Sequence, residues 1–254
     1  MPVDRSELVF ALDELLDAQA INDYCPNGLQ VEGRDQIQRV ATAVTACQAA
    51  IDEAIAWQAD LLLVHHGYFW KGESHPVVGM KRQRLGALLG ANMNMVAYHL
   101  PLDYHPELGN NSGLGRRLQA TLPPFAMQVG DVAQPIWQGV FQAPCDAATL
   151  HQGIEAALGR SCVWVRVNKP QIRRFGWCTG GAQHLIDQAA LLGLDAFISG
   201  EISEQTTHSG REQGVHFFAA GHHATEREGV QALGAWLERR FGLEHRFIDV
   251  PNPA

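Results

Sequence analysis

The segment Arg39–Gly67, RVATAVTACQAAIDEAIAWQADLLLVHHG, contains the pattern that decides the fold. An apolar run from Val40 to Val44 is followed by apolar residues at three- to four-residue spacing, and then by a second apolar run, Leu61–Val64. This alternation predicts a strand, a helix and a strand. Because a helix connects the two strands, we expect a βαβ unit and therefore a parallel sheet.

The same pattern occurs a second time in the chain. The segment that begins at Arg174, RFGWCTGGAQHLIDQAALLGLDAFISGEI, aligns with the first without a gap at an offset of 135 (174 − 39). A further match, at an offset of 123 (226 − 103), relates MVAYHLPLD, ending at Asp103, to FAAGHHATE, ending at Glu226. The chain is therefore predicted to be internally duplicated. The identical pairs of the longer match are Arg39 and Arg174, Gln48 and Gln183, Ile51-Asp52 and Ile186-Asp187, Ala54 and Ala189, and Asp60 and Asp195.

Histidines and carboxylates follow the apolar runs in both copies. Two adjacent histidines end the first long run, and both copies of the shorter match contain His, three residues and a carboxylate. Ligands of α/β sheets gather at the carboxyl ends of parallel strands, so we expect a site there. The residues that would line it are His65, His66, Asp103, His222 and Glu226.

Local geometry sets conditions on these side chains. Residues four apart share a helix face, so His222 and Glu226 converge if Ala224 begins a helix. Adjacent residues of a continuing strand point to opposite faces of the sheet. For both adjacent histidines to serve one site, we expect the chain to leave strand geometry at Val64, which Gly67 would permit.

The donor types indicate a site for two metal ions. Two or three imidazoles and two carboxylates, one of them bridging, suit two cations about 3.5–4 Å apart that share a hydroxide. Histidine and carboxylate donors bind Zn, Mn, Fe or Co, and the sequence does not discriminate among these metals. The other interpretation is that the histidines are structural.

Composition limits the class of protein. The 254 residues are 46% hydrophobic and 18% charged with a formal net charge of −8, which argues against a broad nucleic-acid-binding surface. Cys25, Cys47, Cys145, Cys162 and Cys178 show no CxxC spacing, so we expect neither a disulfide framework nor a thiolate zinc site. The N-terminus is an amphipathic helix rather than a signal peptide, and no apolar run approaches the roughly 18 residues of a membrane span. We expect a cytoplasmic protein with no membrane partner.

Several longer motifs resemble one protein family. They are DYCPNGLQVEG, VHHGYFWKGE, YHLPLDYHPELGNN, CTGG, FISGEISEQTTHS and AAGHHATEREG. Together they are similar to the family of GTP cyclohydrolase I type 2 homologues (Nif-three-like), and most similar to its compact bacterial YbgI-like branch. The resemblance runs from about Asp23 to the C-terminal IDVPNPA and so covers nearly the whole chain.

The resemblance implies a fold and an assembly. The family has an α/β fold of two intertwined halves, each a small mixed sheet flanked by helices. We expect residues 1–125 and 227–254 to form the first half and residues 126–226 the second. Larger relatives carry a third domain between the halves, and the segment from Pro123 to Arg173 is too short for it, so no inserted domain is expected. The family also implies a ring-shaped homo-hexamer whose metal sites face the inner cavity.

The resemblance also implies functions for individual residues. It predicts two divalent transition-metal ions per chain. His99 matches a family position beside the metals, where it would take part in catalysis by supporting the ligands or by moving a proton. His223 would either point outward or support its neighbour. The metal ligands that the family implies are His65, His66, Asp103, His222 and Glu226.

Other residues have two interpretations each. The backbone N–H groups of Thr179 and Gly180 would cradle a phosphate or would form a plain turn. Trp70 and Lys71 would stack on a nucleobase and pair with a phosphate, or would belong to the core or to an interface. Glu201 occupies the position of the second adjacent histidine in the second copy, and would either reach the site or have no function there.

These features favour a metal-dependent hydrolase that acts on a nucleotide or a related small molecule. The family name implies attack on C8 of the guanine ring of GTP, with opening of the imidazole ring and release of formate. A phosphoesterase would use the same metals. The alternative from another class is a metal-binding, ring-shaped scaffold that binds nucleic acid or protein partners, although the acidic net charge does not favour nucleic acid.

Overall fold

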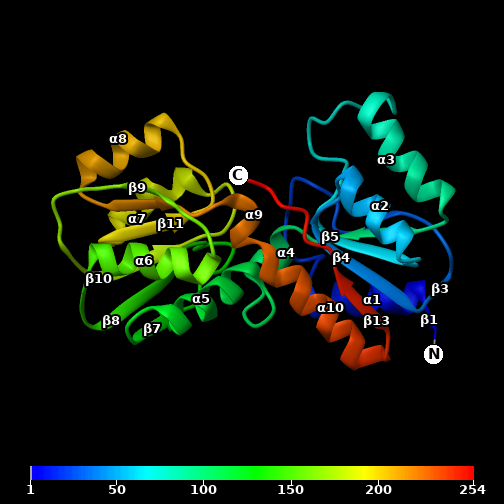
Figure 1. Ribbon diagram of the computed structural model, residues 1–254, viewed down its shortest axis with the longest axis horizontal. Helices are drawn as coiled ribbons and strands as arrows, with labels where there is room; N and C mark the ends of the chain where they lie inside the picture. Colours follow the sequence, from blue (N-terminus) through cyan, green and yellow to red (C-terminus); the bar gives the residue numbers. More distant parts are fainter. Residues whose placement is uncertain (1) are drawn as a thin grey trace. The chain divides into compact units, whose positions relative to one another are not determined.

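Two α/β units, each with its own sheet and cores, make up the computed structural model, which describes residues 2–254 (Figure 1). The first unit comprises the chain up to Leu108 together with Gly229–Pro251, and the second comprises Gly109–Glu228 with Asn252–Ala254. Two segments that are far apart in the sequence, one ending at Leu108 and one running from Gly229 to Pro251, therefore form the first unit, and the halves are intertwined as the resemblance implies. The described residues divide into these two units only, without an inserted third domain.

The division differs from the sequence-based boundaries mainly at residues 109–125, which contain one helix, and also at Arg227–Glu228 and Asn252–Ala254, which lie in the second unit. The boundaries 1–125 plus 227–254 and 126–226 assign α5 (Asn110–Thr121) to the first half, whereas the structure assigns it to the second unit. The reason is packing, since Leu114 and Leu118 of α5 belong to the same hydrophobic core as Leu150 and Ile154 of α6 (Ala147–Leu158).

The first unit is built on a five-stranded mixed sheet with the order β13-β4-β5-β6-β2. Strands β13, β4, β5 and β6 are parallel, and only the edge strand β2 is antiparallel to its neighbour. A separate two-stranded ribbon pairs β1 with β3. The elements are β1 (Val3–Asp4), α1 (Arg5–Leu16), β2 (Gly28–Val31), β3 (Gln36–Ile37), β4 (Arg39–Thr45), α2 (Gln48–Ala56), β5 (Leu61–His66), α3 (Gly79–Gly90), β6 (Asn94–Ala97), α4 (Leu100–Tyr104), α10 (Arg227–Phe241) and β13 (Glu244–Phe247).

Helices cover both faces of this sheet (Figure 1). Leu61 and Leu63 point to one face, where they pack in a core with residues of α1 and α10. Leu62 and Val64 point to the other, where α2 and α3 cover them. Strand β5 is therefore buried on both sides, which explains why its sequence is a continuous apolar run rather than an alternating one.

The second unit repeats this plan with a six-stranded sheet of order β7-β8-β10-β11-β12-β9. Strands β10, β11 and β12 are parallel, and β7, β8 and β9 pair antiparallel. Helices α5 and α6 pack on one face, and α7 and α8 on the other (Figure 1). The remaining elements are β7 (Phe125–Gln128), β8 (Trp137–Asp146), β9 (Val163–Val165), β10 (Gln171–Trp177), the short 3-10 helix η1 (Gln183–Leu185), α7 (Ile186–Leu191), β11 (Ala196–Ser199), α8 (Glu204–Gln213), β12 (His216–Ala219) and α9 (His222–Thr225).

The predicted duplication is confirmed at the level of strand register. Val40 pairs with Leu61 in the first unit, and Phe175 pairs with Ala196 in the second, so both partners shift by the same 135 positions. The aspartates before β5 and β11 also make the same bonds. One carboxylate oxygen of each accepts two backbone N–H groups at the start of the neighbouring strand; these donors are Gln38 and Arg39 for Asp60, and Arg173 and Arg174 for Asp195.

The change of offset toward the end of the repeat is also located. Asn94 and His216 occupy equivalent register positions, which is an offset of 122 (216 − 94), whereas His99 and His222 differ by 123 (222 − 99). Gly221 is the extra residue, and its φ of 102° lies in the region that favours glycine. The insertion therefore sits between β12 and α9, directly before the second copy of the histidine motif.

Candidate metal centre

The adjacent histidines of the first unit are the last two residues of β5. The expectation that the chain leaves strand geometry at Val64 was therefore wrong, because the backbone continues to pair with β4 as far as His66. The two imidazoles nevertheless lie side by side, with ring centroids 4.4 Å apart. The neighbouring strands end at about the same level as β5. Side chains from opposite faces of the sheet can therefore approach each other beyond the strand ends.

Gly67 serves a different purpose from the one expected. It does not have a positive φ, but a side chain there would overlap its surroundings. A Cβ would lie 2.2 Å from Gln30 Oε1 and 2.7 Å from the Ala97 side chain. The same Gln30 oxygen accepts the backbone N–H of Tyr68 at 2.7 Å. The absence of a side chain at Gly67 thus lets the loop after β5 pack closely against β2 and β6.

Both histidines at the end of β5 are anchored through Nδ1. The buried His65 ring donates from Nδ1 to the carbonyl oxygen of Tyr98 at 3.0 Å, which leaves Nε2 as its lone-pair nitrogen. His66 Nδ1 lies 3.1 Å from the Thr45 hydroxyl. The Nε2 atom of His65 lies 3.6 Å from Asp103 Oδ1 on α4. The neighbouring strands therefore fix the orientation of each ring.

His99, which follows β6, is held by a carboxylate that the sequence interpretation did not include. Asp23 accepts the Nδ1 proton of His99 at 2.9 Å and also the N–H of Leu100 at 2.9 Å. Burial by itself would raise the pKa of Asp23, but the hydrogen bond and the charge of His99, with the bonds from Asn27 and Leu100, lower it to about 2. Asp23 is therefore ionised at neutral pH and keeps the proton of His99 on Nδ1.

Three imidazoles of the first unit thus gather at the carboxyl ends of its parallel strands. His65, His66 and His99 each offer one ring nitrogen, and these atoms lie within 4.8 Å of one another. The only signal for Asp23 in the sequence is its place in the motif DYCPNGLQVEG. Its pairing with His99 bridges 76 residues and has no local pattern.

The second unit places its histidine in an equivalent setting. His222 is the first residue of α9, and its Nδ1 donates to Glu201 Oε1 at 2.7 Å. Its Nε2 lies 3.1 Å from Oε2 of the buried Glu226. Burial alone would lower the pKa of His222, but Glu226 and then Glu201 raise it to about 9. Glu201, whose function the sequence left open, therefore orients His222. The neighbouring His223 donates its backbone N–H to the Ala254 carbonyl at 3.3 Å.

The turn after β10 uses within its own unit the two backbone N–H groups that were considered for a phosphate cradle. The N–H of Thr179 donates to Asn111 Oδ1 at 3.1 Å, and the N–H of Gly180 donates to Thr225 Oγ1 at 3.1 Å. These two donors are therefore already used within the unit. Gly180 instead allows a close approach, because a Cβ at this residue would lie 2.0 Å from Glu226 Oε1.

Two aromatic side chains, Tyr24 and Trp70, lie beside the imidazoles of the first unit. The Trp70 ring lies edge-on to His99 with centroids 5.0 Å apart, and Tyr24 is 4.9 Å from His99 in a similar edge arrangement. Trp70 and Tyr24 also face each other at 5.8 Å. Lys71 is exposed, and its backbone N–H donates to the Tyr24 carbonyl at 2.8 Å. Of the two expected substrate-contacting residues, Trp70 therefore lies next to the histidines, and Lys71 lies on the adjoining surface.

The donor sets within each unit fit a divalent transition-metal ion. Two donors that are each about 2.0–2.2 Å from one cation, at a right angle, are roughly 3 Å apart. The imidazole–carboxylate distances of 3.6 Å for His65 and Asp103 and 3.1 Å for His222 and Glu226 are close to this value. The carboxylates and carbonyl behind the rings are the partners that orient metal-binding histidines in proteins.

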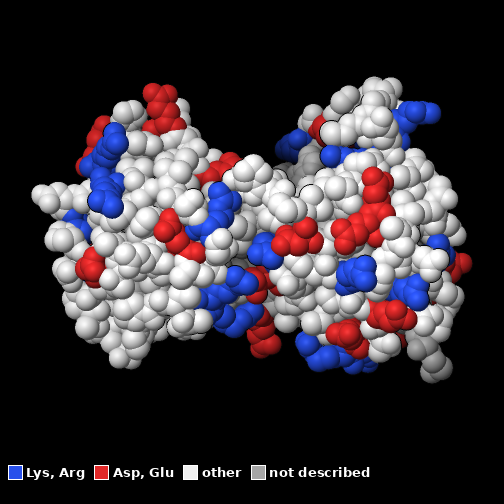
Figure 2. Space-filling view, in the orientation of Figure 1, with Lys and Arg blue, Asp and Glu red and all other residues white. Residues whose placement is uncertain are grey.

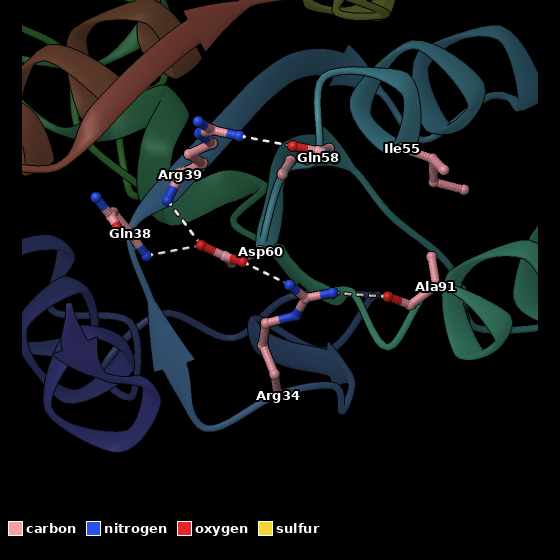
Figure 3. A pocket seen from close by; sticks show the side chains of 8 residues that line it. Arg34, Gln38, Arg39, Ile55, Gln58, Asp60 and Ala91 are labelled. Atoms are coloured by element: carbon pink, nitrogen blue, oxygen red, sulfur yellow. Dashed lines mark hydrogen bonds and ion pairs between the residues drawn. The ribbon is translucent and has the colours of Figure 1, made fainter.

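A cavity of about 590 Å³ lies at the amino ends of the strands of the first sheet, away from the histidines (Figure 3). Figure 3 shows Asp60 at its centre, bonded to Arg34 and to the backbone of Gln38 and Arg39, the residue before β4 and its first residue. Arg34 also donates to the Ala91 carbonyl at 2.9 Å. Since these polar groups already bond to one another, we interpret the cavity as structural. Its lining includes the hydrogen bonds of Asp60 that fix the amino ends of the strands.

The distribution of surface charge does not indicate a strongly charged partner. On the face of the described residues drawn in Figure 2, Lys and Arg side chains are interspersed with Asp and Glu, and they form no continuous basic surface. Within residues 2–254, no helix has the length and apolar character needed to span a membrane.

Comparison with known proteins identifies the family. Residues 3–253 match the family model described as Duf34/NIF3 (NGG1p interacting factor 3). The chain belongs to this family. Among curated Duf34/NIF3 relatives, the GTP cyclohydrolase 1 type 2 homolog of Pseudomonas aeruginosa is 53% identical over 254 residues, 100% of both chains. The protein of the same name from Escherichia coli K12 is 51% identical over 251 residues, 98% of this chain and 99% of that one.

Solved structures of Duf34/NIF3 proteins share the fold. The protein ybgI, of unknown function, superimposes with a TM-score of 0.93 at 49% identity, covering 99% of this chain and 100% of that one. A protein of Thermus thermophilus superimposes with a TM-score of 0.87 at 33% identity, again over 99% and 100% of the chains. The predicted family and its YbgI-like branch are thus confirmed.

Proposed function

We propose that this Duf34/NIF3 protein is a dinuclear-metal-dependent hydrolase that acts on a nucleotide or a related small molecule. The proposed ligands of two divalent transition-metal ions are His65, His66, Asp103, His222 and Glu226. The ions would supply Lewis acidity and would lower the pKa of a bound water molecule.

The orientation of the histidines is the observation that carries this proposal. His65, His66 and His222 each have Nδ1 engaged by a neighbouring oxygen, so each presents Nε2 as its remaining ring nitrogen. A structural histidine needs only to satisfy its hydrogen bonds. The repeated use of Nδ1 for support, with a carboxylate near Nε2 of His65 and His222, is instead typical of metal ligands.

His99 is the residue that we propose for proton transfer. Its Nδ1 proton is bound to Asp23, so Nε2 is the atom that can accept a proton from water and later donate it to a leaving group. The Asp23 carboxylate, ionised at neutral pH, would stabilise the imidazolium that forms. His99 would therefore act as the general base and acid, with Asp23 as its positioning residue.

The two aromatic side chains beside His99 favour a planar substrate. Tyr24 and Trp70 border His99, and flat aromatic side chains stack well on heterocyclic bases. Lys71, on the adjoining surface, is a candidate partner for a phosphate. Because relatives carry the name GTP cyclohydrolase 1 type 2 homolog, GTP is the first substrate to test, with ring opening at C8 and release of formate.

The decisive experiment follows formate and phosphate release separately while metal-loaded protein is screened against a nucleotide panel. Formate release supports the cyclohydrolase reaction, and phosphate release without formate supports a phosphoesterase. We expect His65→Ala to abolish turnover. His99→Ala should retain the metals yet slow the reaction by roughly 10²–10⁴-fold, as expected for the loss of a general acid or base.

A scaffold function is the alternative, and the family description as an interacting factor favours it. It predicts no metal-dependent turnover of any nucleotide with any of the candidate metals, and partner binding that is unaffected by His99→Ala. A ring-shaped homo-hexamer and a cytoplasmic location remain predictions, which sedimentation of the purified protein and fractionation of cells would test.

A further inference from the structure

A second cluster of potential metal ligands lies in the second unit, on α6 and the turn that follows it. His151 and Glu155 are one helical turn apart on α6, and Cys162 directly precedes β9. Each of the three offers one ligand atom, and these atoms lie within 4.8 Å of one another. None of the three belongs to the metal centre described above. The sequence did not indicate this cluster, because its cysteine lacks a second thiol at metal-site spacing.

The Nε2 atom of His151 is buried and has no hydrogen-bond partner among the described residues. Glu155 Oε1 lies 3.4 Å away, in a geometry that does not make a hydrogen bond. The His151 ring stacks on Trp164, with centroids 4.9 Å apart and an interplanar angle of 27°, so the direction of Nε2 is fixed. Leaving a buried polar atom without a partner is unfavourable. A ligand from outside the chain would satisfy this nitrogen.

The other two members are held together by the backbone. The N–H of Cys162 donates to Glu155 Oε1 at 3.0 Å, which brings the thiol next to the carboxylate. Burial and the charge of Glu155 raise the pKa of the Cys162 thiol to about 12, although Arg160 acts in the opposite direction. A cation at this point would offset the charges of the carboxylate and the thiolate together, and the thiol would lose its proton as the cation binds.

We propose that His151 Nε2, a carboxylate oxygen of Glu155 and Cys162 Sγ bind one further divalent transition-metal ion. One nitrogen, one oxygen and one sulfur donor suit Zn²⁺, which accepts all three in tetrahedral geometry with water in the fourth position. The side chains of His151 and Glu155 are 23% and 32% exposed, so an ion can enter from solvent. The bound ion would tie the C-terminal half of α6 to the start of β9.

Cobalt provides a test that does not depend on enzyme activity. The full chain is stripped with a chelator and titrated with Co²⁺. Thiolate-bound Co²⁺ absorbs strongly in the near ultraviolet through sulfur-to-metal charge transfer, whereas nitrogen and oxygen ligands do not produce this band. The ligands proposed for the main centre are only nitrogen and oxygen donors, so the band reports the new site. We expect a band whose final intensity corresponds to one thiolate-bound ion per chain and that is absent in Cys162→Ser.

The matched control is Cys25→Ser, because Cys25 is another cysteine within reach of a histidine and a carboxylate. This variant should retain the band, and His151→Gln should weaken cobalt binding at least tenfold. The proposal is overturned if wild type shows no band, if the band persists in Cys162→Ser, or if Cys25→Ser removes it. Should Cys162→Ser not fold, alkylation of wild type decides: Zn²⁺ must protect Cys162 from iodoacetamide, and equal labelling with and without Zn²⁺ overturns the proposal.

Discussion

Carboxylates that accept the Nδ1 proton fix the ring orientation of two histidines of the candidate metal centre. Asp23 binds Nδ1 of His99 in the first unit, and Glu201 binds Nδ1 of His222 in the second. Glu201 occupies the position of His66 after the shift of 135 residues (66 + 135 = 201). The two copies therefore use one position differently, as a proposed ligand in the first and as a support in the second.

We expect Asp23→Asn to reduce turnover by about 10–100-fold, the usual effect of removing the group that orients a histidine at a metal site. An amide can donate to Nδ1, so it no longer fixes the proton there, and it cannot stabilise the imidazolium. Steady-state kinetics at constant metal content measure the effect. Asp52→Asn on the exposed face of α2 is the control, and equal rates for the two variants would argue against a function for Asp23.

Gly180→Ala should lower both metal content and stability. Its φ is 66°, and the added Cβ would collide with Glu226 Oε1 and displace a proposed ligand. Gly214→Ala is a matched control, because Gly214 has a φ of 68° and no atom lies within 4 Å of the position that its Cβ would take. Both variants bear the left-handed strain of about 1–2 kcal/mol. Only Gly180→Ala should lose metal in elemental analysis, and a similar loss in both would contradict this account.

At the scale of elements, one aspartate in each unit fixes the start of the central strands. Asp195 Oδ2 accepts the N–H groups of Arg173 and Arg174, and Oδ1 pairs with Lys169 at 3.0 Å. Asp60 repeats this arrangement in the first unit with Arg34 as its cation. Each aspartate therefore joins the loop before one strand to the first residues of its neighbour and fixes the register between them.

We expect Asp195→Asn to lower the free energy of unfolding by about 1–2 kcal/mol at pH 7, since charged hydrogen bonds are lost. Burial would raise the pKa of Asp195, but the two N–H donors and Lys169 lower it overall. A lowered folded-state pKa stabilises the fold above the unfolded value of about 3.9, and this stability disappears as the pH falls through the folded pKa. The difference between wild type and variant in urea unfolding should therefore shrink below about pH 4.

The exposed Asp187 on α7 provides the control for this measurement. Asp187→Asn should change the free energy of unfolding by less than about 0.5 kcal/mol, as surface substitutions usually do. Asp60→Asn should resemble Asp195→Asn, because both carboxylates make the same backbone bonds. A pH-independent effect of Asp195→Asn would show that the charge is not what stabilises this element.

At the scale of the whole molecule, metal binding and folding stability should be linked. An ion that binds only the folded chain stabilises it by about 2.7 kcal/mol when its free concentration is 100-fold above its dissociation constant. We therefore expect chelation to lower the melting temperature by roughly 5–10 °C and re-addition of metal to restore it. Differential scanning calorimetry with elemental analysis of each sample measures this. An unchanged melting temperature in protein shown to be metal-free would contradict the linkage.

Local sequence patterns were enough to predict the secondary structure of the repeat and the position of its histidines. Apolar periodicity predicted β4, α2 and β5, and the gap-free match predicted β10, α7 and β11 with the same register. These predictions succeed because the spacing of apolar residues along a helix or strand shows which of its faces is buried. The position of histidines after apolar runs likewise predicted their gathering at the carboxyl ends of strands.

The pairing of the polar groups around the site, in contrast, became known from the three-dimensional structure. Asp23 reaches His99 across 76 residues, and Asn111 takes the Thr179 N–H across 68. The gathering of His151, Glu155 and Cys162 depends on how the chain turns after α6. Such contacts leave no periodic signal, because many polar residues can satisfy a given donor. Which one does so is fixed by the packing of the elements that carry them.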